Sequence, residues 1–394
     1  MSKDGKQRRP LLRDSKRMKT NARAASKGSF SKYFPANLAS PHFLWWLGAF
    51  AAIGFAAGCA TQTKVEKVDY FFPPPPDAPR LQFLTSFSSE KELHGGEEKT
   101  LMNYLTGSRP AEKILSKPYG AAVGNKKIYI CDTELGAVVV ADLATKHFGV
   151  IDAQGEGALR MPLNVTVDSD GACYVADAGR EQVVVFDKNG HYLSTIGTQN
   201  ELKPRDVAVG GNRIYVADLQ KHRVCVFDKT THNLLLEIPR SEDQTNQARA
   251  LFTPTNLGLD SKGNLYVSDT GAFRVQVYDS EGRFLSSIGE MGDGPGQFAR
   301  VKGIALDREN RLYAADAMSQ VVQIFNNEGR PLTWFGEPGN DKLQNLPAKV
   351  VVDYDDVAAF ERYASPKFKL EHLVFVINQI GPHKVSVYGF GHMK

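Results

Sequence analysis

This 394-residue sequence lacks several short motifs that identify cofactor-binding or catalytic sites. It has only four cysteines and no Cys-x-x-Cys-His, so covalent haem attachment has no support. No Gly-x-Ser-x-Gly motif is present, and the glycine-rich segment 289–298 lacks the Lys-Ser/Thr of a phosphate-binding loop. Apart from Cys59, near the N-terminus, the cysteines are Cys131, Cys173 and Cys225, and each lies in an apolar segment. Three cysteines are an odd number and cannot all form disulfides with one another. We therefore expect them to be small buried hydrophobic residues.

The positive charge is concentrated at one end of the chain. The formal net charge is +4, but residues 1–58 alone contribute +9, which leaves −5 for residues 59–394. A basic surface for nucleic acid is therefore poorly supported in the body of the protein.

Residues 43–58 form an uncharged, mainly apolar run that follows the basic segment. At 1.5 Å per residue this run is short for a membrane-spanning helix and is typical of a signal peptide. Ala56-Ala57-Gly58-Cys59 resembles the bacterial lipoprotein signal, which implies a signal peptide over 1–58 and lipidation of Cys59. Met18 is an alternative start, and an uncleaved signal anchor is the alternative interpretation of the leader.

A proline-rich segment follows Cys59. Pro73 to Pro76 are four consecutive prolines, which favour extended polyproline II. We expect 59–79 to be a semi-rigid tether that holds the domain at 80–394 away from a membrane, in the periplasm or at the outer membrane of the cell envelope.

The body of the chain is built from an internal repeat. Tyr-x-x-Asp recurs with a mean period of about 46 residues, which is typical of propeller blades. The clean copies begin at Tyr129, Tyr174, Tyr215, Tyr266 and Tyr313, and a weaker copy begins at Phe375.

Each repeat contains four segments with strand character, joined by short glycine-containing turns, which predicts four-stranded antiparallel sheets. Continuous apolar runs such as 183–186 indicate sheets covered on both faces. Because an aspartate ends the second strand of each of the five clean repeats, we assign it a structural role as an acceptor of backbone hydrogen bonds. Arginines five residues after Asp218 and Asp269 are positioned to pair with them.

The phrases Tyr-Val-Ala-Asp and Arg-Val-x-Val-Phe-Asp, with the loop 289–298, resemble NHL repeats. This resemblance covers about residues 80–392 and implies an all-β, six-bladed β-propeller. The last repeat lacks an outer strand, and residues 80–87 match the missing pattern. We expect this N-terminal strand to close the ring.

Three segments exceed the repeat and are candidates for binding loops. Residues 88–116 include a short predicted helix over 101–105, and residues 239–253 enlarge the loop before the fourth unit. Residues 354–371 include a predicted helix over 357–363 and lie on the opposite face.

The two residues after each opening proline are expected at the mouth of the central channel. Among them, Asn164, Asp206 and Asn256 come from consecutive blades and are candidate oxygen ligands for calcium, or else bond to one another and to the backbone. The competing hypothesis is that basic side chains attract an anionic ligand to the same mouth. These side chains are Arg205, Lys302 and Lys349.

Related propellers include metal-dependent lactonases and an amidating lyase, but the sequence departs from their pattern. Gly120 stands where the lactonases need an acidic ligand, and none of the nine histidines falls at the mouth positions. We therefore predict a membrane-anchored, non-catalytic binding or scaffold lipoprotein, with a protein or an envelope polymer as its partner. The alternative is a metal-dependent hydrolase or lyase with its site at the channel mouth.

Overall fold

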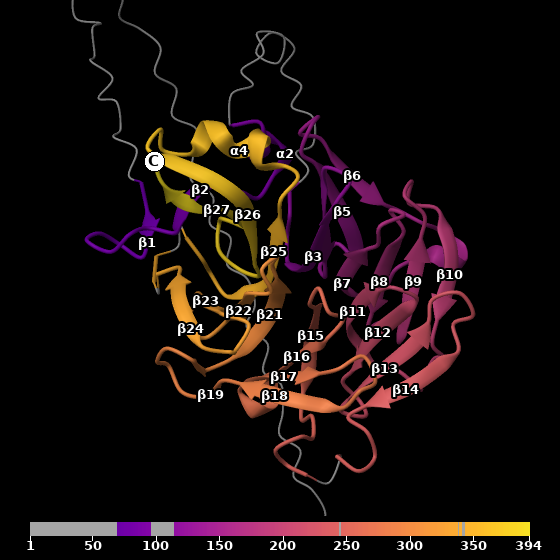
Figure 1. The fold of residues 1–394 in the computed structure, drawn as a ribbon. Coiled ribbons are helices and arrows are strands. Elements are labelled where there is room, and N and C mark those ends of the chain that lie inside the picture. Colours follow the sequence, from indigo (N-terminus) through magenta and orange to yellow (C-terminus); the bar gives the residue numbers. More distant parts are fainter. Residues whose placement is uncertain (1–68, 96–113, 244–245, 338, 341–342) are drawn as a thin grey trace, which may run out of the picture. The chain divides into compact units, whose positions relative to one another are not determined.

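The computed structural model describes residues 69–95, 114–243, 246–337, 339–340 and 343–394. These residues form six sheets of antiparallel strands arranged in a ring, which confirms the predicted six-bladed β-propeller (Figure 1). The predicted signal peptide, Cys59 and the helix expected over 101–105 lie outside the described residues. Within the described ranges, no helix is both long and apolar enough to cross a membrane.

Five of the blades are consecutive four-stranded meanders, as the repeats predict. Blade one contains β3 (Pro118–Gly124), β4 (Lys127–Asp132), β5 (Ala137–Asp142) and β6 (Phe148–Ile151). Blade two contains β7 (Pro162–Val167), β8 (Cys173–Asp177), β9 (Gln182–Phe186) and β10 (Tyr192–Ile196). Blade three contains β11 (Pro204–Gly210), β12 (Arg213–Asp218), β13 (Arg223–Asp228) and β14 (Leu234–Ile238). Blade four contains β15 (Pro254–Leu259), β16 (Leu265–Asp269), β17 (Arg274–Tyr278) and β18 (Phe284–Ile288). Blade five contains β21 (Val301–Leu306), β22 (Leu312–Asp316), β23 (Val321–Phe325) and β24 (Pro331–Phe335).

Blade six joins the two ends of the described chain. Its first three strands are β25 (Pro347–Asp353), β26 (Phe368–Asn378) and β27 (Val385–Met393), and β2 (Leu81–Phe87) pairs antiparallel with β27. This pairing confirms the predicted closure. The segment 59–79, predicted as a tether, contains a fifth strand of this blade, β1 (Phe71–Phe72), which pairs with β2. Phe72 packs on Tyr388 with ring centroids 6.2 Å apart, so this part of the segment lies against blade six.

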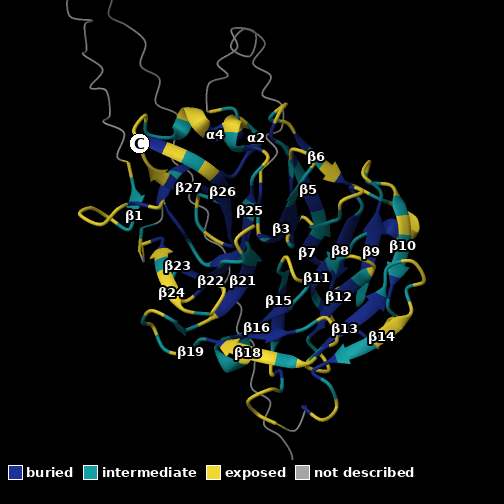
Figure 2. Ribbon diagram, in the orientation of Figure 1, coloured by how far each residue is buried: buried dark blue, intermediate teal, exposed yellow. Residues whose placement is uncertain are grey.

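Burial decreases from the inside of each blade to its outside (Figure 2). Strands such as β16 are buried along their whole length because neighbouring blades cover both faces, whereas β18 has three exposed residues in a row. The apolar core lies between successive blades and is therefore a ring of clusters. Cys131, Cys173 and Cys225 are buried free thiols, as predicted.

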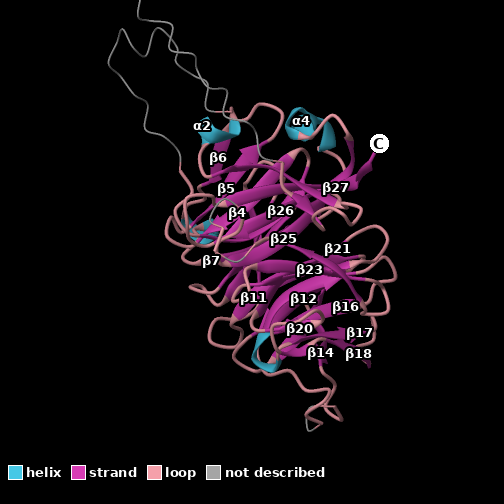
Figure 3. Ribbon diagram, turned by 90° about the vertical axis from the view of Figure 1, so that its left-hand side faces the viewer, coloured by secondary structure: helices cyan, strands magenta, loops and turns pink. Residues whose placement is uncertain are grey.

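Helices are few and lie outside the strands (Figure 3). The predicted helix after β25 is confirmed as α4 (Val357–Phe360), which continues into a 3₁₀ turn at Glu361–Tyr363. The other short helical segments are α2 (Glu90–Leu93) and 3₁₀ turns at Gly155–Gly157 and Thr270–Ala272. Before blade five, β19 (Glu290–Met291) and β20 (Gln297–Phe298) pair in parallel within the predicted glycine-rich loop.

Candidate ligand site at the channel mouth

Each innermost strand departs from regular pairing where it begins. In β3, β7, β11, β15, β21 and β25 the register against the second strand shifts within the first few residues. Such irregularities re-aim side chains that would otherwise alternate across the sheet. The shift falls at the first residue after the opening proline in β7, β15 and β25, and within the first two residues after the opening residue of the other three strands. The local backbone thus sets these positions apart from the repeated core.

The repeated aspartates hold these strand beginnings in place. Asp132 accepts hydrogen bonds from the backbone N–H groups of Ser116 and Lys117, just before β3, and from Leu135 in the following turn. The aspartates of blades two to five accept equivalent bonds from backbone N–H groups just before the innermost strand of their own blade. These aspartates are Asp177, Asp218, Asp269 and Asp316. The predicted structural role is confirmed.

The predicted arginine pairs are also present. Arg223 Nε lies 3.0 Å from Asp218 Oδ2, and Arg274 Nε lies 3.7 Å from Asp269 Oδ2. Burial nevertheless raises the pKa of Asp269, against the effect of the backbone donors and of Arg274.

Asp206, the second residue of blade three after Pro204, is the centre of the polar contacts at the mouth. Its side chain is fully buried, and its Oδ2 lies 2.8 Å from the Lys349 ammonium of blade six. The same oxygen accepts hydrogen bonds from the Asn256 side-chain amide at 3.3 Å and the Leu257 N–H at 3.0 Å. Oδ1 accepts the Val207 N–H at 2.8 Å. The carboxylate is therefore neutralised and hydrogen-bonded within the protein.

Asn164 and Asn256 are each fully buried, and each has a side-chain oxygen without a hydrogen-bond partner among the described residues. Asn164 uses its amide group to donate to the Arg205 carbonyl at 3.1 Å. A Cβ atom on residue 120 would lie only 1.9 Å from Asn164 Oδ1, so the glycine there makes room for this side chain. Asn256 and Asp206 thus meet directly, whereas Asn164 contacts the backbone next to Asp206.

These contacts do not fit a calcium ion. The only carboxylate of the three candidate ligands already carries the Lys349 ammonium, so the group offers no net negative charge to a divalent cation. In the described part of the chain, no three His, Cys, Asp or Glu side chains are grouped closely enough to hold a metal. We therefore derive no chemical step through a metal here.

A second set of contacts centres on Tyr119, the first residue after Pro118. Lys302 Nζ lies 5.2 Å from the centroid of its ring and Arg205 Cζ lies 5.9 Å from it. Lys302 also donates to Gln379 Oε1 at 3.2 Å, from the turn after β26. Blades one, three, five and six therefore contribute side chains to one group at the mouth.

Lys302 has an unusual electrostatic environment. It is 6% exposed, and burial lowers its pKa to about 8, with further lowering by the charges of Arg300 and Arg205. Lys349 is similarly buried but has Asp206 as its partner. The mouth thus combines one neutralised pair with a group of uncompensated cations.

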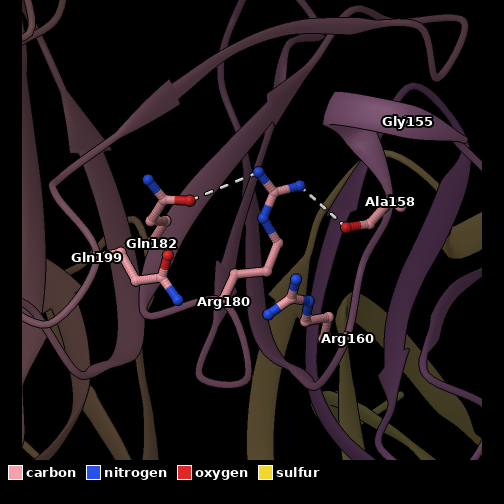
Figure 4. Close-up of a pocket in the computed structure, with 6 residues that line it drawn as sticks. All are labelled: Gly155, Ala158, Arg160, Arg180, Gln182 and Gln199. Carbon is pink, nitrogen blue, oxygen red and sulfur yellow. Dashed lines mark hydrogen bonds between the residues drawn. The ribbon is translucent and has the colours of Figure 1, made fainter.

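Two cavities accompany the mouth. One, of about 280 Å³, is the channel itself, lined mainly by apolar residues of all six innermost strands, with Thr166 and Lys349. The other, of about 210 Å³, lies among the loops of blade two (Figure 4). There Arg180 donates to the carbonyls of Glu156 and Ala158, and Arg160 lines the same cavity. Arg180 is therefore occupied by bonds from its turn, between β8 and β9, to the loop that precedes β7.

The sequence located the mouth residues but not their partners. Arg205, Lys302 and Lys349 occur at the mouth, yet the Lys349–Asp206 pair joins residues 143 positions apart and has no local signal. Tyr119 could have been singled out by its position after Pro118. Gln379 could not, because it lies outside the innermost strands.

Comparison with known proteins supports the fold. A family model described as DUF5128, 6-bladed beta-propeller, matches residues 245–332, which include most of blades four and five. A comparison of the sequence with curated proteins found no match.

Solved structures with similar folds include several propellers. A gluconolactonase from Xanthomonas campestris has a TM-score of 0.52 at 15% identity, over 83% of this chain and 99% of that one. A protein of unknown function from Bacteroides thetaiotaomicron has a TM-score of 0.51 at 17% identity, over 70% of each chain. Virginiamycin B lyase from Staphylococcus aureus has a TM-score of 0.48 at 14% identity, over 69% of this chain and 80% of that one. At these identities the likeness to the first two structures concerns the fold alone.

Proposed function

We propose that this protein is a cell-envelope lipoprotein whose propeller, of the NHL-repeat type, binds a protein or an envelope polymer without catalysis. The face that carries the channel mouth is the binding face in this proposal. The loops around the mouth differ between blades, whereas the strands behind them repeat. Such a rigid ring with variable loops is suited to recognition.

The state of Asp206 is the observation that carries the non-catalytic assignment. A general base needs a free carboxylate, and a metal site needs an uncompensated one. Asp206 instead has an ammonium partner at 2.8 Å and three further donors. No specific observation favours the alternative, a metal-dependent hydrolase or lyase. A calcium titration that raised the melting temperature of the purified protein would support that alternative.

The leader supports the anchoring part of the proposal. Residues 43–58 and Cys59 have the pattern of a lipoprotein signal, which would place the propeller on the periplasmic or outer-membrane side of the envelope. Mass spectrometry of the purified mature chain should find a lipidated Cys59 at its N-terminus. An unmodified Cys59 would contradict this part.

Binding can be tested with the full chain, extracted in detergent and immobilised, against an envelope fraction of the source cells. Arg300 is exposed beside the mouth, and Lys188 is exposed in the hairpin between β9 and β10, on the opposite face. Since rim charges steer association, Arg300→Glu should reduce capture of the partner several-fold, whereas Lys188→Glu should leave it unchanged. Equal capture by both variants would refute binding at the mouth.

A further inference from the structure

Three basic side chains at the mouth have no acidic partner among the described residues. The Lys302 ammonium is buried, and its only hydrogen-bond partner among the described residues is the neutral side chain of Gln379. Arg205 has a buried Nε without a hydrogen-bond partner. Arg300, two residues before Lys302, is exposed, and its charge acts on Lys302. Lys302 and Arg205 thus both lie over the Tyr119 ring, and Arg300 is close enough to affect Lys302.

Such a group is unfavourable in the empty protein. A buried ammonium without a counterion loses hydration that a neutral amide replaces only in part, and like charges nearby add repulsion. Two other cations of the described ring have carboxylate partners, in the pairs Lys349–Asp206 and Arg223–Asp218. The half-buried Arg180 instead donates to two backbone carbonyls. At the mouth, by contrast, two cations without a carboxylate partner among the described residues lie over the same tyrosine ring, so their charges add at one place.

We propose that Lys302, Arg205 and Arg300 bind a phosphoryl dianion, either free phosphate or the phosphomonoester group of a larger ligand. This inference rests on the proposed function and names the chemical group that the binding face would recognise. A guanidinium presents a planar fork of donors that matches phosphate oxygens, and an ammonium adds a point charge.

The charge of the site favours a dianion over a carboxylate. Three uncompensated cations would keep two positive charges with a carboxylate bound, but only one with a phosphomonoester above its second pKa of about 6. Lys349 is not available for a fourth contact because Asp206 holds it. The Tyr119 ring, which both Lys302 and Arg205 approach, gives the site an aromatic wall.

The test is calorimetric titration of the full chain in detergent with four probes: inorganic phosphate, glycerol 3-phosphate, dimethyl phosphate and acetate. We expect the two dianions to bind at least about tenfold more tightly than the singly charged dimethyl phosphate and acetate. Equal binding of inorganic phosphate and glycerol 3-phosphate indicates free phosphate, and tighter binding of the ester indicates a phosphomonoester ligand.

Two variants link the binding to the site. Lys302→Gln and the exposed Arg300→Gln should each weaken phosphate binding about tenfold or more, while Lys188→Gln on the opposite face should not. At pH 8.5, titrations in two buffers of different ionisation enthalpy should show proton uptake on binding, because the anion recharges Lys302. Lys302→Gln should abolish this uptake, which a merely structural effect of the substitution would not do.

Phosphate binding that is absent at millimolar concentration, or unchanged in both variants, would overturn the inference. Loss of phosphate binding with intact, Arg300-dependent capture of an envelope partner would refute the dianion and leave the proposed function standing. Phosphate binding without any captured partner would refute the proposed function and leave the dianion site standing.

Discussion

Lys302 shows how a single residue at the mouth links stability to ligand binding. The propeller buries its ammonium and gives it only a neutral hydrogen-bond partner, so the folded protein holds the proton less firmly than the unfolded chain. The unfolded lysine has an ordinary pKa of 10.5, against about 8 in the fold. Between these two pH values the unfolded state therefore binds more protons, and stability rises with pH.

Replacing Lys302 by methionine should remove this dependence. In phosphate-free buffer we expect the free energy of unfolding of the variant to exceed that of the parent protein at pH 7. At this pH the buried, charged lysine destabilises the folded parent protein most. The difference should shrink by roughly 2 kcal/mol on going from pH 7 to pH 10. Urea unfolding at several pH values measures it. A difference that stayed constant with pH would mean that Lys302 is neutral or compensated throughout this range.

At this scale, residue types were predictable from the sequence and partnerships were not. The aspartates of the Tyr-x-x-Asp motif recur in five of the six blades, so their hydrogen bonds to the backbone could be inferred from repetition. Asp206 and Lys349 each occur once, in blades three and six, and only the closed ring brings them to 2.8 Å. A single sequence contains no spacing that encodes such a contact.

Among the elements, the innermost strands decide what the mouth can hold. Two of them have glycine at the second position after the opening residue, in blades one and five. A Cβ atom at Gly303 would lie 2.3 Å from the Lys349 Cα, and one at Gly120 would lie 1.9 Å from Asn164 Oδ1. These glycines are required by the close approach of the neighbouring blade, and they make room for the polar residues there.

Gly120→Ala should therefore destabilise the protein by about 1–3 kcal/mol through overpacking. Gly149→Ala in β6 is the matched control, since its Cβ would meet nothing closer than 3.8 Å and should change stability little. Adding Asn164→Ala should recover part of the loss, because it removes the nearest clashing atom and leaves the Leu163 carbonyl oxygen, 2.4 Å from the new Cβ. Chemical denaturation of the parent protein, of the single variants Gly120→Ala and Asn164→Ala, and of the double variant gives this coupling energy. Additive effects would show that Asn164 is not the obstacle.

The elements themselves were largely readable from the repeat, with one omission. Four apolar segments per unit, separated by turn residues, identified the strands because a propeller blade uses the same pattern each time. Strand β1 was missed because Phe71 and Phe72 precede a run of prolines, a context that favours an extended tether. Their pairing with β2 depends on the tertiary position of blade six.

For the molecule as a whole, closure is the feature on which the other arrangements depend. Blade six takes β25, β26 and β27 from the C-terminal end of the chain and β2 from a segment almost 300 residues earlier. The mouth draws side chains from several blades, so its geometry exists only when the ring is closed. Leu81, Leu84 and Phe87 of β2 are buried in the clusters that seal blade six.

Removing β2 should therefore unfold the whole domain, and not only remove one strand from a domain that stays folded. Burial of the three apolar side chains contributes roughly 5–9 kcal/mol, which is comparable with the total stability of a typical domain. We expect a chain starting at residue 88 to lose cooperative thermal unfolding and phosphate binding together. A chain starting at residue 69, which keeps β1 and β2, is the control and should retain both. If the shorter chain melted cooperatively near the temperature of the control, blade six would be stable with three strands, and β2 would not be the element that closes the ring.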